Sequence, residues 1–276
     1  MKTGKINSVI VSLTLVAAAL LVVTLFVVMQ GGDHGDRANG KLVKNKASSS
    51  IVPDFAAIPD VSEKKKAFFD YLRPAISHHN QIIADERKFL LLSQQHLNDG
   101  QALSEAEKFR ILKLASKYQY EMRDVSLDAL ENLLVRVDIV PENLVLIQAA
   151  NETGWGSSRF AREGLNFFGQ WCFKQGCGLV PQSRNTGAIH EVAVFDSVDA
   201  SVGSYMKNLN SNEAYSVLRA IRADLRAENK PIIASKLVYG LMNYSERQGA
   251  YVEELLEMLR HNKKYLVVKN EQRTAV

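Results

Sequence analysis

The sequence predicts a mainly α-helical fold with a small β segment, preceded by one membrane-spanning helix. From residue 61 onward, apolar residues recur mostly at intervals of three and four, the spacing of one helix face. Residues 189–195 form an alternating run that is typical of a strand. The chain has 276 residues, of which 46% are hydrophobic and 23% charged. This composition excludes a disordered tail protein, a collagen-like repeat and a disulfide-dense mini-protein.

The first segment predicts a membrane anchor over residues 1–30. Residues 9–29 carry no charge, and about twenty apolar residues can cross the ~30 Å hydrocarbon layer as one helix. Lys2 and Lys5 precede the run, so we expect a single-pass protein of the inner (cytoplasmic) membrane whose C-terminal domain faces the periplasm or extracytoplasmic space. A cleaved signal peptide is the alternative, but the run is longer than a signal requires and lacks an Ala-x-Ala site.

Two segments connect this anchor to the rest of the chain. Residues 31–60 predict a flexible linker, because their Gly, Asp, Asn, Lys and Ser residues cannot bury enough apolar area to offset the entropy of ordering. Residues 61–136 predict a helical region without a chemical constellation, and we expect a packing or positioning role for it. The helices expected there cover residues 64–73, where Pro74 would stop the first, then residues 75–97, a helix capped by Ser104 with Glu107, and residues 126–137.

The charge pattern gives no sign of a nucleic-acid partner. The formal net charge is +4, from 34 basic and 30 acidic residues. The longest basic runs are residues 64–66 and 263–264, and neither forms a stripe interleaved with aromatic residues. We interpret both runs as solvated surface.

The two cysteines, Cys172 and Cys177, enclose the short sequence Phe-Lys-Gln-Gly. A disulfide across this loop is plausible outside the cytoplasm, and two free thiols are the alternative. A cysteine pair alone is a weak zinc signal, because two further ligands are needed and only His190 lies near in sequence. We expect neither a metal nor a cofactor.

The most informative segment is residues 141–168. Pro141 suits the first turn of a helix, and Glu152 follows at the end of its largely apolar run. A carboxyl group beside apolar and aromatic side chains should have a raised pKa, and a protonated carboxyl can donate to a glycosidic oxygen. Trp155 and Phe168 could stack on a sugar ring. The alternative is a surface glutamate at a helix end, followed by a core tryptophan.

Two stretches in this segment resemble the signature of the bacterial glucosaminidases of glycoside hydrolase family 73, which belong to the lysozyme-like superfamily. The stretches are Gln-Ala-Ala-Asn-Glu-Thr-Gly-Trp-Gly-Ser-Ser at residues 148–158 and Asn-Phe-Phe-Gly at residues 166–169. The resemblance implies a lysozyme-like catalytic domain over residues 137–265 with a small β-hairpin lobe, followed by a tail over residues 266–276.

The resemblance also implies a reaction and a site. The expected reaction is cleavage of the glycan strands of peptidoglycan after N-acetylglucosamine, with Glu152 as the general acid. The residues expected to bind the substrate are Trp155, Asn166, Phe168, Gln170 and Tyr244, the last matching a tyrosine that lines the family's active site. Gln170 begins a departure from the family pattern, which often continues with Ile-Lys, and this leaves the shape of the groove open.

The second catalytic group is less well defined by the sequence. Glu191 is the one acidic residue between Cys172 and Phe195, where the family has its variable β lobe. It is a candidate base or nucleophile, although the family's acid falls somewhat earlier in the lobe. The alternatives are that Glu191 is a solvent-facing strand residue and that the acetamido group of the substrate assists.

Three further functions compete with this hydrolase. A lytic transglycosylase would use one acid and leave an anhydro end. A non-catalytic wall-binding or scaffold protein would keep the groove without turnover. A metal-dependent peptidase lacks support, since no His-Glu-x-x-His cluster is present.

Overall fold

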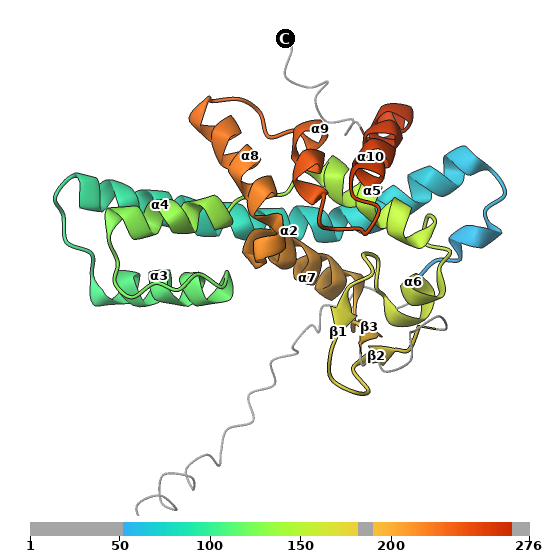
Figure 1. Cartoon of the computed structure of the whole chain (residues 1–276), viewed down its shortest axis with the longest axis horizontal. Helices are drawn as coiled ribbons and strands as arrows, with labels where there is room; N and C mark the ends of the chain where they lie inside the picture. The colour runs from blue at the N-terminus through green and yellow to red at the C-terminus, as the bar shows by residue number, and fades with distance from the viewer. Residues whose placement is uncertain (1–51, 182–189, 267–276) are drawn as a thin grey trace, which may run out of the picture. The chain divides into compact units, whose positions relative to one another are not determined.

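The computed structural model describes residues 52–181 and 190–266, which fall within one compact unit. The expected anchor over residues 1–30, most of the linker and nearly all of the tail therefore lie outside the described residues. Within the described ranges, no helix combines the length and the apolar character needed to cross a bilayer. The described residues are mainly helical with one small sheet, as the sequence predicts (Figure 1).

The longest helix, α2 (Val61–Asn98), continues through Pro74, so the predicted stop at this proline is wrong. A proline inside a helix removes one backbone hydrogen bond and costs about 3 kcal/mol or more. Tertiary packing offsets this cost, because Leu72, Ala75 and Ile76 on either side of the proline are buried in the core. The helix can therefore serve as a single support against which α4 (Leu127–Arg136), α5 (Glu142–Thr153) and α7 (Val198–Ser211) all pack.

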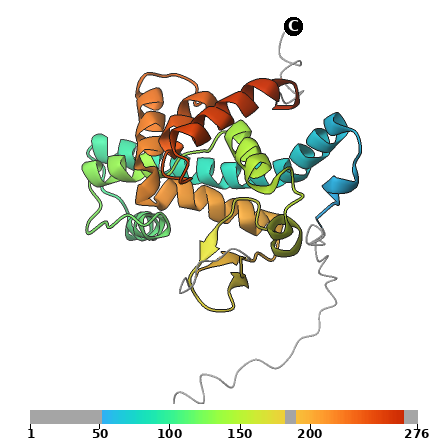
Figure 2. The same ribbon diagram turned by 45° about the vertical axis from the view of Figure 1, so that its right-hand side comes forward.

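The other helices surround this support (Figures 1 and 2). Ser104 and Glu107 form the predicted capping box at the start of α3. The α10 helix packs against α5, which brings the C-terminal part of the chain to the segment that carries Glu152. The remaining elements are α3 (Glu105–Lys117), α6 (Arg159–Gly164), α8 (Ser216–Ala227), α9 (Ala234–Leu237), α10 (Gly249–His261) and α11 (Lys263–Leu266), with short 3₁₀ turns at Phe55–Ala57, Glu213–Tyr215 and Val238–Leu241.

A buried cluster of charges holds the start of α5 in place. The Asp138 carboxylate accepts two hydrogen bonds from Arg226, both at 2.9 Å. The buried guanidinium of Arg222 donates to the backbone carbonyls of Val135, Arg136, Asp138 and Ile139. These bonds satisfy backbone carbonyl groups between α4 and α5 and attach this segment to α8. They therefore stabilise the start of α5, the helix that carries Glu152.

The small β lobe is a three-stranded antiparallel sheet, which has one strand more than the expected hairpin. Its strands are β1 (Trp171–Cys172), β2 (Gly178–Leu179) and β3 (Glu191–Ala193), in the order β1-β3-β2. Trp171 and Leu179 both pair with Val192, so β1 and β2 flank β3 instead of pairing with each other. The close approach of β2 requires glycine at position 178, where an added Cβ would lie 2.0 Å from the Val192 carbonyl oxygen. The sheet packs beside α6.

Candidate active site

Glu152 lies in the last turn of α5, where three consecutive residues then reverse the chain. Gly154, Trp155 and Gly156 all have positive φ angles, of 55°, 61° and 78°. Gly156 is additionally required by space, since an added Cβ would fall 2.5 Å from the Phe55 ring. The Thr153 hydroxyl accepts a hydrogen bond from the Gly156 amide at 2.9 Å. This tight reversal fixes the end of α5 and with it the Glu152 side chain.

Glu152 opens onto a cavity of about 1330 Å³. This is larger than the roughly 300–1,000 Å³ typical of a pocket for one small ligand, and the cavity is open to solvent, so an extended polymer can enter. Polar and aromatic side chains from the sheet, α7 and the turn before α10 line the cavity together. They include Glu152, Phe168, Gln170, Trp171, Lys207, Asn208, Tyr215, Tyr244, Ser245 and Glu246.

The Glu152 carboxyl is mostly buried, and this burial raises its pKa above the ordinary value. A hydrogen bond from the Tyr251 hydroxyl to Oε1, at 2.8 Å, and the charge of Arg247 lower the pKa, whereas Glu254 raises it further. Burial is the largest of these effects, so the carboxyl group holds its proton to higher pH than an exposed glutamate does. A protonated carboxyl on a cavity wall can act as a general acid.

A chain of hydrogen bonds behind Glu152 fixes the orientation of Tyr251. The Gln148 amide donates to the Tyr251 hydroxyl at 3.0 Å, and its carbonyl oxygen accepts from the Tyr205 hydroxyl. The rings of Tyr205 and Tyr251 are buried in the core. Sequence reasoning did not predict the role of their hydroxyl groups. The available signal was Gln148, a polar residue within an apolar helix, which needs partners when buried.

Tyr244 and Phe168 lie at the cavity and complete the aromatic wall. Tyr244 stacks on Tyr251 with ring centroids 5.5 Å apart, and its hydroxyl donates to the Phe168 carbonyl at 2.7 Å. The Phe168 ring is itself stacked on Tyr205 at 3.9 Å and is almost fully buried. Two other aromatic residues of the cavity wall are exposed, Trp171 at 58% and Phe173 at 68%, and the Trp171 ring stacks on His190. Trp171 is thus better placed than Phe168 to meet a sugar face.

Asn166 and Gln170 have different positions. The buried Asn166 side chain donates to the carbonyls of Gln170 and Ala193, both at 2.9 Å, and accepts from the amides of Phe168 and Gln170. It therefore shapes the turn without lining the cavity. Gln170 does line the cavity, where it donates to the Ser201 carbonyl at 3.1 Å and accepts from the Ser204 hydroxyl at 2.8 Å.

Trp155, which the sequence predicts to stack on the substrate, is not among the residues of the cavity wall. Its ring packs against Phe68 and Phe69 of α2, with centroids 5.9 and 5.2 Å away, and the Lys65 ammonium lies 4.8 Å from its centroid. The left-handed turn at residues 154–156 directs the indole to this helix. Trp155 therefore anchors the reversal after Glu152.

Glu191 is likewise absent from the cavity wall. It is 5% exposed, and its two oxygens accept hydrogen bonds from the amides of Gly176 at 3.0 Å and Gly178 at 2.8 Å. A disulfide joins Cys172 and Cys177 in the same loop, so neither sulfur is a free thiol or thiolate ligand. The carboxylate thus holds this loop together, a structural role that differs from the predicted role of base or nucleophile. Among the described residues that line the cavity, the carboxylates are Glu152 and Glu246.

Comparison with known proteins assigns this helical domain to a protein family. The family model described as glucosaminidase, mannosyl-glycoprotein endo-beta-N-acetylglucosaminidase, matches residues 127–264. The chain belongs to this glucosaminidase family, which confirms the resemblance seen in the sequence. It is also similar to Protein bax of Escherichia coli (strain K12), with 35% identity over 224 residues that cover 81% of this chain and 78% of the relative. No solved structure matches the chain.

Proposed function

We propose that this protein is a peptidoglycan hydrolase that cleaves glycan strands after N-acetylglucosamine, with Glu152 as the general acid. The observation that carries the proposal is a carboxyl group with a raised pKa on the wall of a large open cavity, inside a glucosaminidase-family domain. Such a group can protonate the leaving oxygen of a glycosidic bond near neutral pH. We also propose that the domain has a lysozyme-like fold.

The two oxygens of Glu152 have separate roles in this mechanism. Oε1 accepts the hydrogen bond from Tyr251, so the acidic proton belongs on Oε2. An ideal Cβ on Gly169, a residue of the cavity wall, would lie 3.8 Å from Oε2. Oε2 thus lies beside a residue of the cavity wall, and we expect the glycosidic oxygen to arrive on this side.

The second carboxylate in the mechanism is Glu246. It lies on the cavity wall in the turn before α10 and is exposed to solvent, whereas Glu191 is bound by backbone amides. An ionised carboxylate there can activate a water molecule or stabilise the oxocarbenium-like charge. Assistance by the acetamido group of the substrate is the competing route, and it needs no second carboxylate.

The proposed location is the outer face of the cytoplasmic membrane. Residues 9–29 form the anchor, and the linker connects it to the domain, which acts on periplasmic or extracytoplasmic glycan. The disulfide between Cys172 and Cys177 is consistent with an oxidising compartment.

Digestion of purified peptidoglycan tests the proposed reaction. The full chain in detergent is incubated with the substrate, and the released fragments are identified by mass spectrometry. We expect fragments with reducing-end N-acetylglucosamine. Fragments with anhydromuramic ends would instead identify a lytic transglycosylase. Binding of peptidoglycan without release of any fragment would identify a wall-binding protein.

A further inference from the structure

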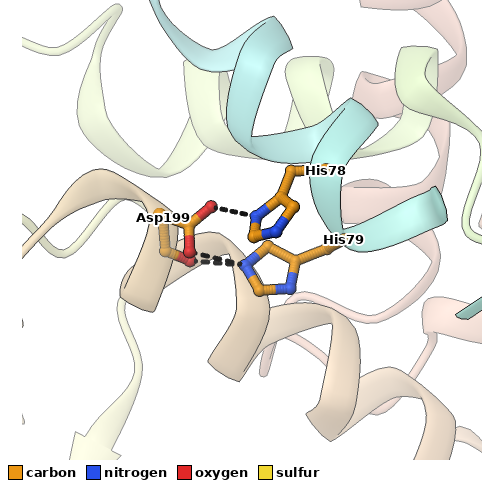
Figure 3. A group of neighbouring side chains, drawn as sticks. All are labelled: His78, His79 and Asp199. Carbon is orange, nitrogen blue, oxygen red and sulfur yellow. Dashed lines mark hydrogen bonds and ion pairs between the residues drawn. The ribbon is translucent and has the colours of Figure 1, made fainter. Parts of the chain in front are cut away.

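Two adjacent histidines of α2 meet one aspartate of α7 (Figure 3), and none of the three residues lines the cavity. His78 Nδ1 lies 2.8 Å from Asp199 Oδ1. His79 Nε2 lies 3.2 Å from Asp199 Oδ2 and 2.9 Å from the Asp199 carbonyl oxygen. The carboxylate is thus placed between two imidazole nitrogens that come from neighbouring positions of one helix.

These three groups are the donors that a zinc-class ion uses in proteins. One ligand atom from each residue lies within 4.8 Å of the other two, so a small inward movement brings all three within reach of one ion. Each imidazole can keep its remaining proton on its other ring nitrogen, and the carboxylate supplies a negative charge. The proton now shared in each hydrogen bond would be replaced by the metal.

The three side chains are accessible to solvent, and the packing around them holds them in position. The side chains of His78 and Asp199 are 58% and 42% exposed, so an ion can enter from solution and keep water as a further ligand. Gly203, one turn further along α7, makes room for the His79 ring, because an added Cβ would lie 2.4 Å from a ring carbon. The helices α2 and α7 pack directly against each other and hold the donors in position.

We propose that His78, His79 and Asp199 bind one divalent transition-metal ion of the zinc class, which links α2 to α7. The ion takes Nδ1 of His78, Nε2 of His79 and a carboxylate oxygen of Asp199, and water completes the coordination. The α7 helix also carries Ser204, Lys207 and Asn208 of the cavity wall, so the ion stabilises one side of the cavity without lining it. This inference does not depend on the proposed glycosidase activity.

Titration of the chelator-treated full chain with Zn²⁺ in detergent tests the site. We expect one strongly bound ion per chain by isothermal titration calorimetry, with affinity at least tenfold weaker in His78→Ala and in His79→Ala. His96→Ala and His261→Ala are matched controls, because both side chains are accessible to solvent and each pairs with a single glutamate outside the cluster. An affinity that stays unchanged in both cluster variants, or falls equally in the controls, would overturn the proposal.

Thermal unfolding distinguishes a missing site from a misfolded variant. At a free Zn²⁺ concentration about a hundred times the Kd, the midpoint of the wild type should rise by roughly 5–10 °C. His78→Ala changes an exposed side chain, so its metal-free midpoint should stay close to that of the wild type while the rise on adding Zn²⁺ disappears. The same rise in His78→Ala as in the wild type would contradict the site.

Discussion

The Tyr251 hydroxyl donates a hydrogen bond to Glu152 Oε1 at 2.8 Å, across 99 positions of sequence. The bond reserves Oε1 as an acceptor and stabilises the ionised form of the carboxyl, whereas burial favours the protonated form. Burial is the stronger effect, and the pKa of Glu152 is raised. The hydrogen bond from Tyr251 therefore offsets part of the rise in the pKa of Glu152 that burial causes.

Tyr251→Phe should move the alkaline limb of the kcat/KM profile to higher pH. The variant removes a donor that stabilises the carboxylate, so the pKa of Glu152 rises further and the acid stays protonated at higher pH. We expect kcat/KM at its own optimum to change by less than about tenfold. Tyr239→Phe is the control, because Tyr239 is exposed. An alkaline limb that moves to lower pH would contradict this role.

The motif around residue 152 singled out Glu152 as the candidate acid, but it could not show which neighbours reach this carboxyl group. Tyr251 follows a core-like helical pattern, and only the packing of α10 on α5 brings its hydroxyl to Glu152. Trp155 follows Glu152 closely in sequence, yet the left-handed backbone turns its ring toward α2. Side-chain direction after a tight reversal depends on φ angles that residue types alone do not specify.

The fold was predictable where one local signal decided the structure and unpredictable where distant packing decided it. The capping box of Ser104 and Glu107 formed as the pattern predicts. Pro74 is a strong local signal for the end of a helix, but α2 continues through it because the residues on both sides are buried in the core. Glu191 fits a catalytic interpretation by composition, whereas the disulfide loop places two amides on its carboxylate.

Glu152→Gln should stabilise the fold at alkaline pH. A carboxyl whose pKa is higher in the folded state than in the unfolded state contributes stability below the unfolded pKa, and this contribution is lost as pH rises through the folded pKa. The amide does not ionise and keeps the acceptor for Tyr251. We expect a higher unfolding midpoint than the wild type at pH 8, by roughly 2–4 °C for each kcal/mol gained, and a smaller difference at pH 4. A difference that grows toward acid would be inconsistent with the raised pKa.

Glu246→Gln should lower kcat by about a hundredfold, because it removes the carboxylate assigned to activate water. Its side chain is exposed, so the unfolding midpoint should stay close to that of the wild type. Steady-state release of soluble fragments, together with thermal unfolding, measures both effects. Full activity in this variant would favour assistance by the substrate acetamido group instead.

Glu191→Gln should affect stability more than catalysis. The amide oxygen can accept from one of the two glycine amides, while its NH₂ group faces the other. We expect a loss of about 1–3 kcal/mol in the free energy of unfolding and a kcat within tenfold of the wild type. Thermal unfolding and fragment release separate the two effects. A hundredfold lower kcat with an unchanged unfolding midpoint would restore Glu191 as a catalytic candidate.

The rate of fragment release from peptidoglycan by Glu152→Gln tests the central claim most directly. The control is Glu163→Gln, which makes the same change at an exposed position of α6. The account predicts a kcat at least a hundredfold lower for Glu152→Gln with a folded protein, and a kcat unchanged for the control. Release by Glu152→Gln at the wild-type rate would contradict the assignment of Glu152 as the general acid.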